Sequence, residues 1–224
     1  MKFIAYTYKG LEGITAKEVK GRILSEKRVC FSKNRSFIGS SLFYYDFIKE
    51  IKFNDLKDLI SQVKKIKVSI KGKFKVDCNK ENNNLSSQEI KANIGEIFHN
   101  KKFKVDLENP NTVIFLDING NICYLGKNPV YYKRNYKVRS SRDSISSVIG
   151  YSLLKIADYN SKETLIDPFC SDGVILIEAA LLKGKKLYGL SEDIKNARIN
   201  SKVAKIKIEF STIPKNENTP EKKS

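Results

Sequence analysis

Residues 165–180 read LIDPFCSDGVILIEAA, and this stretch sets the architecture of the C-terminal part of the chain. A short apolar strand breaks at Asp167, turns through small residues and resumes as an apolar run that ends beyond Glu178. A strand that feeds through such a turn into a helix leaves free backbone N–H groups at the helix start. We therefore expect the turn to bind a ligand, with backbone amides from Cys170 to Gly173 exposed to it.

The flanking sequence repeats the same alternation of helix and strand. A helix is predicted over 145–160, and after the quoted stretch we expect a strand over 182–190, a helix over 191–206 and a strand ending at Ile213. The buried stripe of the first helix is predicted to comprise Val148, Ile149, Leu153 and Ile156. Alternating strands and helices indicate a parallel α/β sheet, which binds ligands beyond the carboxyl ends of its strands.

The N-terminal half has a different pattern, in which helices are separated by several strands. Helices are predicted near 11–20, over 53–66 and over 85–100, with Thr15, Asn54 and Ser86 as their caps. The segment from Phe103 onward predicts strand, turn, strand, tight Asn-Gly hairpin and strand. This order is typical of an α+β domain with helices on one face of a small sheet.

The charge and cysteine content limit the function classes. The 42 Lys and Arg residues outnumber the 25 Asp and Glu residues, and the formal net charge is +17. This excess favours a polyanionic partner such as nucleic acid, the alternative being solvated lysines without a partner. No apolar run approaches the ~20 residues of a membrane-spanning helix, and no signal-peptide pattern is present. The four cysteines are far apart and His99 is the single histidine, which predicts no metal site and a reducing, cytoplasmic location.

Two stretches resemble the THUMP-domain RNA methyltransferases. The Ser-Ser-Gln-Glu-Ile helix start at Ser86, the Val-Asp-Leu-x-Asn-Pro turn at Val105 and the Asn-Gly hairpin leading to Tyr-Leu-Gly are characteristic of a THUMP domain. The run "DPFCSDGVILIEAAL" is similar to the Asp-Pro-Phe-Cys-Gly-Ser-Gly-Thr signature of the methyltransferase domain of these enzymes. The resemblance implies a tRNA substrate and guanine N2 as the methyl acceptor.

The resemblance also implies a division of the chain. An N-terminal ferredoxin-like segment, 1–50, precedes a THUMP domain, 51–127, and a basic connector, 128–143. A partial Rossmann-like domain, 144–213, and a disordered tail, 214–224, follow. The expected fold class is therefore an α+β N-terminal part followed by an incomplete α/β methyltransferase domain.

The implied cofactor is S-adenosylmethionine, bound at the quoted turn. By analogy with the family, Asp167 faces the ammonium of the methionine, and a carboxylate after the next strand accepts the ribose hydroxyls. The expected contact residues are Asp167, Pro168, Phe169, Cys170, Ser171, Gly173 and Glu192. Ser171 stands in place of the first glycine of the signature. Ser191 stands where the acidic residue is expected. Glu192 or Asp193 therefore either takes the role of that acidic residue or caps the next helix.

The basic connector is the candidate RNA contact. Lys133, Arg134, Lys137, Arg139 and Arg142 are interleaved with tyrosines, which either join the RNA contact or pack a domain interface. Neutralising Arg134 and Arg139 is expected to weaken tRNA binding and to flatten its salt dependence.

The catalytic Asn-Pro-Pro-Tyr signature of the family does not follow the quoted turn. The similar run "NPVYY" at Asn128 follows a strand of the THUMP hairpin, and we interpret it as connector. A second polypeptide is therefore predicted to supply the missing strands and the catalytic loop. The alternative is a non-enzymatic RNA-binding protein derived from such a methyltransferase.

Overall fold

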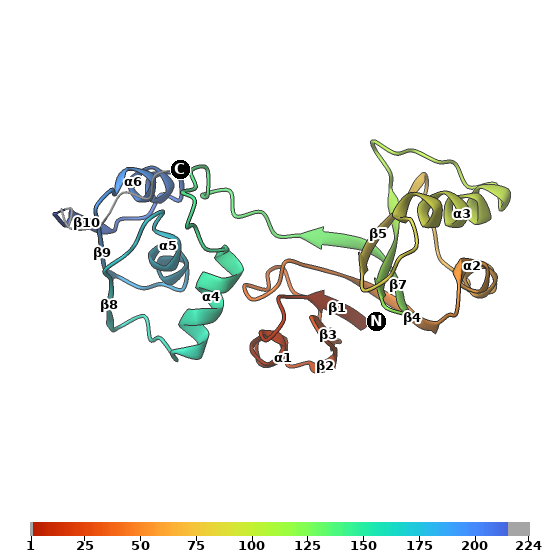
Figure 1. Ribbon diagram of the computed structural model, residues 1–224, viewed down its shortest axis with the longest axis horizontal. Coiled ribbons are helices and arrows are strands. Elements are labelled where there is room, and N and C mark those ends of the chain that lie inside the picture. The colour runs from red at the N-terminus through yellow and green to blue at the C-terminus, as the bar shows by residue number, and fades with distance from the viewer. Residues whose placement is uncertain (1, 215–224) are drawn as a thin grey trace. The chain divides into compact units, whose positions relative to one another are not determined.

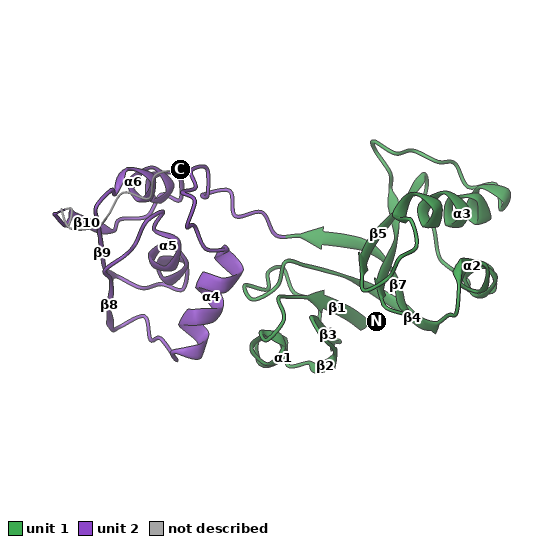
Figure 2. Cartoon of the chain, viewed as in Figure 1, with its two compact units in different colours: residues 1–131 green, residues 132–224 purple. Residues whose placement is uncertain are grey.

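The computed structural model describes residues 2–214, which form two compact units that divide between Tyr131 and Tyr132 (Figure 2). Of the tail predicted over 214–224, all but Pro214 lies outside the described residues. No helix within 2–214 is both long and apolar enough to cross a membrane.

The first unit is built on a seven-stranded sheet with the strand order β2-β3-β1-β4-β7-β6-β5 (Figure 1). β5 and β6 are parallel, and the other neighbouring strands are antiparallel. The elements are β1 (Lys2–Tyr6), α1 (Glu12–Val19), β2 (Arg22–Ser25), β3 (Arg28–Phe31), β4 (Phe43–Lys52), α2 (Leu56–Lys64), β5 (Phe74–Glu81), α3 (Ser87–Asn100), β6 (Thr112–Asn119) and β7 (Ile122–Tyr131).

Strand β4 joins the first fifty residues to the rest of the unit. It pairs with β1 on one side and with β7 on the other. The predicted domain boundary at residue 50 falls inside this strand, and β7 continues through the first four residues assigned to the connector. The N-terminal segment and the following α+β layer therefore share one continuous sheet.

The helix caps agree with the sequence in one of three cases. Ser86 caps α3 and accepts the Glu89 N–H at 3.4 Å. The cap of α2 is Asp55, which accepts the Asp58 N–H at 2.8 Å, and the prediction of Asn54 is wrong by one residue. Thr15 is a buried residue inside α1, where its hydroxyl bonds to the carbonyl oxygens of Leu11 and Ser40, so it caps nothing.

The core of the α+β layer lies between α2, α3 and the sheet. The predicted apolar faces of both helices are packed there, including Leu59 and Val63 of α2 and Ile90, Ile94 and Phe98 of α3. The segment from Phe103, predicted as a strand, forms only an isolated bridge between Val105 and Phe74. The Asn-Gly hairpin between β6 and β7 is present, and Gly120 has a φ of 56°.

The second unit contains a three-stranded parallel sheet in the order β10-β9-β8. Its elements are α4 (Ser147–Ile156), β8 (Thr164–Asp167), α5 (Val174–Leu181), β9 (Lys186–Ser191), α6 (Lys195–Val203) and β10 (Glu209–Thr212). The alternation predicted from the sequence is confirmed, and the described part of this unit is a partial Rossmann-like domain.

Helix α4 agrees with the predicted stripe only in part. Val148 is buried and Ile149 is half-buried, but Leu153 and Ile156 are 44% and 57% exposed. Ser147 and Gly150, which were not predicted, are buried. A Cβ at position 150 would lie 3.0 Å from Val174 Cγ1, so α4 packs closely against α5 through its small residues. The prediction followed apolar spacing alone and did not include this close approach of two helices.

Candidate functional site

The turn between β8 and α5 is the candidate site, and its backbone is largely satisfied within the protein. The Cys170 N–H donates to the Leu190 carbonyl at 2.9 Å, the Gly173 N–H donates to the Cys170 carbonyl at 2.6 Å, and the Phe169 N–H donates to Asp167 Oδ1 at 3.1 Å. The expectation that the amides of Cys170 and Gly173 face a ligand is therefore wrong. The start of α5, by contrast, has no side-chain cap.

Two residues of the turn have left-handed backbone conformations. Gly173, with a φ of 75°, begins α5, and a Cβ there would lie 3.2 Å from Cβ of Ala197. Gly173 is thus required by its backbone conformation and by the close approach of α6. Ser171 has a φ of 45°, a region that costs an L-residue about 1–2 kcal/mol.

A pocket of about 230 Å³ opens at this turn, beyond the carboxyl end of β8. Its lining comprises Asp143, Ser144, Ile145, Asp167, Phe169, Cys170, Ser171, Asp172, Val174 and Ile175. Four of the seven predicted cofactor residues line it, while Pro168, Gly173 and Glu192 do not. Sequence reasoning missed the three lining residues that precede α4, because they are brought to the turn only by folding.

Two titratable groups of the turn, the carboxyl of Asp167 and the thiol of Cys170, have raised pKa values. Burial raises the pKa of Asp167, and the hydrogen bond from the Phe169 N–H partly offsets this. Burial, together with the nearby Asp167, raises the pKa of Cys170 to about 11, so that its thiol stays protonated at neutral pH. Burial thus disfavours the charged form of Asp167, and a bound cation would stabilise that form.

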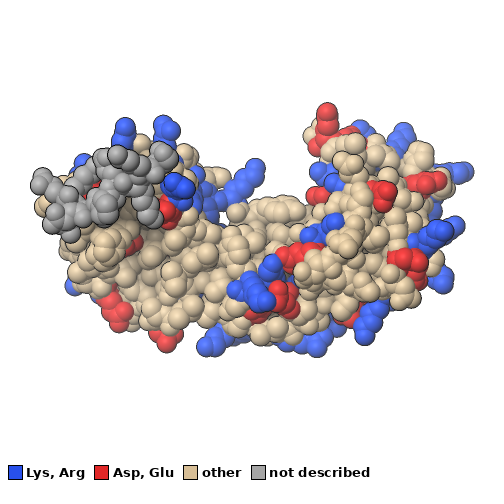
Figure 3. Space-filling model, viewed as in Figure 1, with Lys and Arg blue, Asp and Glu red and all other residues tan. Residues whose placement is uncertain are grey.

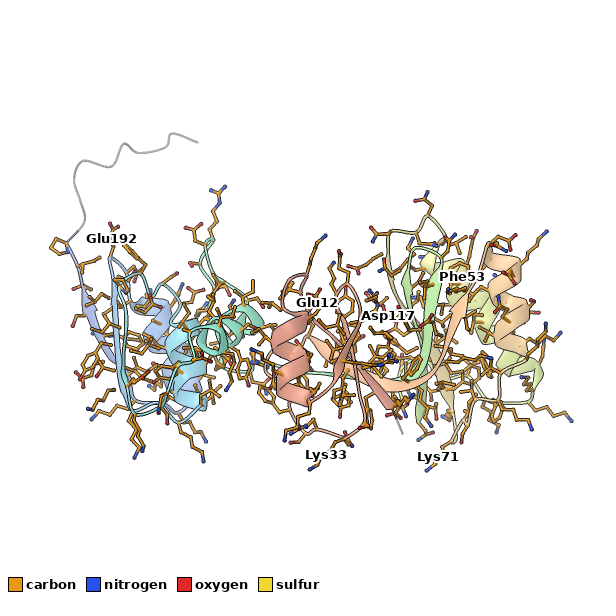
Figure 4. All side chains as sticks on the ribbon, turned by 90° about the horizontal axis from the view of Figure 1, so that it is seen from below. Glu12, Lys33, Phe53, Lys71, Asp117 and Glu192 are labelled. Atoms are coloured by element: carbon orange, nitrogen blue, oxygen red, sulfur yellow. The ribbon has the colours of Figure 1, made fainter. Side chains whose placement is uncertain are left out.

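The acidic pair after β9 is resolved by the structure. Asp193 Oδ1 accepts the Lys195 N–H at 2.8 Å and so serves the start of α6. Glu192 is exposed and extends from the end of the sheet (Figure 4). Asp193 thus takes the helix-start role that the sequence left open, and the ribose role of Glu192 stays a prediction.

Two family matches cover most of the chain. Residues 50–127 match the THUMP domain, and residues 134–217 match the RMKL-like methyltransferase domain. The chain thus carries a THUMP domain followed by a methyltransferase domain.

The curated relatives are longer than this chain. A tRNA (guanine(6)-N2)-methyltransferase of Archaeoglobus fulgidus is 26% identical over 210 residues, which are 81% of this chain and 54% of the relative. The enzyme of the same name from Thermus thermophilus is 28% identical over 134 residues, covering 57% of this chain and 39% of the relative. The chain thus spans about 39% to 54% of the length of these relatives.

Solved structures share the fold. TrmN from Thermus thermophilus covers 95% of this chain, which spans 73% of that protein, with a TM-score of 0.75 at 21% identity. SMU.472, a putative methyltransferase complexed with SAH, gives a TM-score of 0.69 at 13% identity, with 95% of this chain and 75% of that one covered. At these identities the likeness shows the fold of a THUMP domain followed by a Rossmann-like methyltransferase domain.

The basic residues of the connector have different environments in the methyltransferase unit. Arg134 is 10% exposed in its side chain and forms an ion pair with Glu178 at 2.9 Å, and the Lys137 ammonium donates to the Ile145 carbonyl at 2.6 Å. Tyr136 is also buried and donates to Glu178 at 2.6 Å. Lys133, Arg139 and Arg142 have exposed side chains. Only these three of the five predicted RNA contacts are presented to solvent.

The run "NPVYY" lies in the THUMP sheet rather than in a catalytic loop. Val130 and Tyr131 pair with β4, and Asn128 Oδ1 accepts the Val113 N–H at 3.0 Å. These contacts agree with its interpretation as a non-catalytic segment.

A larger groove, of about 760 Å³, lies in the THUMP domain between β5 and α3. Its walls are mostly apolar, including Val76, Val105 and Leu107, with Lys75 and Lys91 beside them. The smaller pocket, by contrast, lies at the carboxyl end of the parallel strand β8, the end at which α/β sheets bind their ligands.

Proposed function

We propose that this chain is the RNA-binding and cofactor-binding part of an S-adenosylmethionine-dependent methyltransferase that acts on N2 of a guanine in tRNA. The observation that carries the proposal is the pocket at the turn after β8, within the segment matched to the methyltransferase domain. The printed activity of the curated relatives and the SAH complex of a protein with this fold support it.

The residues of the pocket fit the amino-acid end of the cofactor. A volume of about 230 Å³ is below the usual range of pockets for whole ligands, which starts at ~300 Å³, so it accommodates a part of a nucleotide. Asp167 would bind the ammonium, and the uncapped start of α5 would stabilise the carboxylate. Phe169, 80% exposed, would lie beside the nucleoside, and Glu192 would accept the ribose hydroxyls. When bound, the cofactor supplies a methyl group activated by its sulfonium.

The RNA would contact the THUMP domain and the three exposed basic residues of the connector. The net charge of +17 supplies the attraction to phosphates. On the face shown in Figure 3, Lys and Arg are scattered among Asp and Glu rather than gathered in one patch. Because no single basic patch stands out on this face, we take the exposed connector residues Lys133, Arg139 and Arg142 as the candidate RNA contacts.

We also propose that a second polypeptide covers the bare face of the methyltransferase sheet. Leu165 and Leu187 pack against the helices, and Figure 1 shows α4 and α5 on the same side of β8 and β9. The alternating residues Ile166 and Tyr188 are 59% and 37% exposed on the other face. Doubly wound sheets are covered on both faces, so an apolar partner surface fits here.

The free thiols of the four cysteines fit the reducing cytoplasm as the location.

The decisive experiment is calorimetric titration of the full chain with S-adenosylhomocysteine, alongside Asp167→Ala and an exposed control, Glu163→Ala. We expect binding by the wild type and the control, and at least tenfold weaker binding by Asp167→Ala. Binding of tRNA without binding of the nucleotide would reject the enzyme and leave a THUMP RNA-binding protein. Methyl transfer to tRNA by the isolated chain would reject the need for a second polypeptide.

A further inference from the structure

The connector is attached to the cofactor turn through the carboxylate of Asp172. Both oxygens of this carboxylate accept the Ser141 N–H, at 3.0 and 2.9 Å. The hydroxyls of Ser141 and Ser171 are 2.7 Å apart. Asp172 is 1% exposed. Two successive residues of the turn therefore hold the same residue of the connector.

Asn200, on α6, joins the same two segments. Its side-chain oxygen accepts the Arg139 N–H at 3.0 Å, and its amide nitrogen donates to the Arg139 carbonyl at 2.9 Å and to the Asp172 carbonyl at 3.0 Å. The residue is fully buried. All the polar groups of this side chain are thus used to bridge the connector and the turn.

These contacts link two parts of the molecule that serve different ligands in the proposed function. The side chain of Arg139 is exposed to solvent, although its backbone is held at both the N–H and the carbonyl oxygen. On the opposite side of the network, Ser171 and Asp172 line the pocket at the turn. Because buried hydrogen bonds are costly to break, a displacement of the turn displaces the backbone of the connector with it.

The ionic state of Asp172 keeps this link in place at neutral pH. Burial alone would raise its pKa, but the hydrogen bonds that it accepts, including those from Ser141 and Asn196, outweigh burial and lower the pKa. A carboxylate without a proton accepts on both oxygens, as the bifurcated bond from the Ser141 N–H requires.

We propose that Asp172 and Asn200 are positioning residues that couple the basic connector to the cofactor turn, so that S-adenosylmethionine and RNA bind cooperatively. The inference rests on the proposed function, since it uses the same turn and the same RNA. Both residues are buried. They act through the backbone of Arg139 and Ser141.

The test measures two affinities in the full chain, each with the other ligand absent and saturating. S-adenosylhomocysteine is titrated by calorimetry, and an unmodified tRNA transcript by fluorescence anisotropy. In the wild type, each ligand should strengthen the binding of the other by the same factor, at least threefold. In Asp172→Asn and Asn200→Ala the factor should fall to one, and Asn200→Ala, whose side chain does not line the pocket, should still bind each ligand on its own.

Tyr136→Phe is the matched control. It removes the hydrogen bonds of the connector residue Tyr136 to Glu178 in α5 and Ser147 in α4. The contacts of Arg139 and Ser141 stay intact. Tyr136 is 6% exposed and does not reach the RNA. The coupling factor should stay at the wild-type value. An equal loss in this variant would attribute the effect to general loosening and would overturn the role of Asp172 and Asn200.

A second measurement avoids variants that fail to fold. Trypsin cleavage after Arg139 and Arg142 of the wild type should slow at least threefold when S-adenosylhomocysteine is bound. Nucleotide binding without a change in cleavage or in tRNA affinity would overturn the coupling and leave the proposed function standing. Absence of nucleotide binding would overturn both, so the two failures are distinguishable.

Discussion

A single carboxylate, Asp117, organises the buried polar groups of the THUMP-containing unit (Figure 4). It accepts two hydrogen bonds from the Arg28 guanidinium, at 2.8 and 2.6 Å, and further bonds from Tyr45 and Asn79. Both members of the ion pair are fully buried. The pair connects β3, in the first fifty residues, to β6, which is four places away in the strand order of the sheet.

Asp117→Ala should therefore lower the free energy of unfolding by about 3–5 kcal/mol, because it leaves the buried Arg28 guanidinium with only the more distant Glu81 carboxylate, at 3.6 Å, as its counter-charge. Urea denaturation followed by circular dichroism measures this loss. The control is Glu26→Gln, which breaks the exposed Lys9–Glu26 pair and should leave stability unchanged. Equal losses in both variants would contradict the special cost of burial.

Backbone strain at Ser171 predicts an order of stability among its substitutions. Glycine adopts a φ of 45° freely, whereas alanine keeps the strain, and both remove the hydrogen bond with Ser141. The free energy of unfolding of Ser171→Gly should therefore be about 1 kcal/mol higher than that of Ser171→Ala. Thermal denaturation of the two variants decides the matter, and the reverse order would show that position 171 is not strained.

The raised pKa of Asp167 predicts a pH dependence of nucleotide binding. In the ligand-free protein, burial disfavours the ionised carboxyl of Asp167 and raises its pKa. Lowering the pH through this raised pKa protonates the carboxyl and removes the free-energy cost of burying its charge. The ammonium of the ligand needs the ionised form. The affinity for S-adenosylhomocysteine should thus fall as the pH is lowered. The fall should begin at a pH above the ordinary Asp pKa of about 3.9. Calorimetry across pH should show a flat and weaker profile for Asp167→Asn.

Helix packing explains the arrangement of elements in the second unit. α4 lies against α5 at Gly150, where a Cβ would touch Val174 at 3.0 Å. Gly13, in α1, has no atom within 4 Å of such a Cβ. The two glycines have the same propensity in a helix, so their surroundings alone decide what a larger side chain does.

Gly13→Ala should stabilise the first unit by about 0.5–1 kcal/mol through helix propensity. Gly150→Val should destabilise the second unit, because a branched side chain must displace Val174 or separate the helices. Chemical denaturation gives both values. A stabilising effect at position 150 would show that α4 and α5 are not closely packed there.

For the chain as a whole, the charge excess predicts how RNA binding responds to salt. Replacing Lys133, Arg139 and Arg142 by Gln should weaken tRNA binding and reduce the slope of log K against log salt by about 0.7–0.9 for each phosphate that is no longer neutralised. Arg134 is left out because it is paired with Glu178. Filter binding at several salt concentrations measures the slope.

The matched control changes the same charge at the opposite ends of the strands. Lys162, Lys183 and Lys185 are exposed and precede β8 and β9, whereas the pocket lies beyond the carboxyl end of β8. Their replacement by Gln should leave the slope unchanged. Equal slopes in the two triple variants would mean that RNA responds to net charge and not to the connector.

The order of the elements and the place of the turn follow from the amino-acid sequence alone. Apolar periodicity predicted the faces of α2 and α3, and small residues after Asp167 predicted the bend before α5, because these features depend on neighbours within a few residues. The linked motifs at Ser86 and Asp167 likewise predicted both family matches.

Which groups are used, by contrast, depends on the folded arrangement of distant segments. Folding paired Arg134 with Glu178, turned α4 toward α5 through Gly150, and brought Ser141 to Asp172 from 31 positions away. Such contacts depend on close packing and on the burial of hydrogen-bonding groups, which arise between segments far apart in the chain. A charge or an apolar side chain looks the same in sequence whether or not folding supplies its partner.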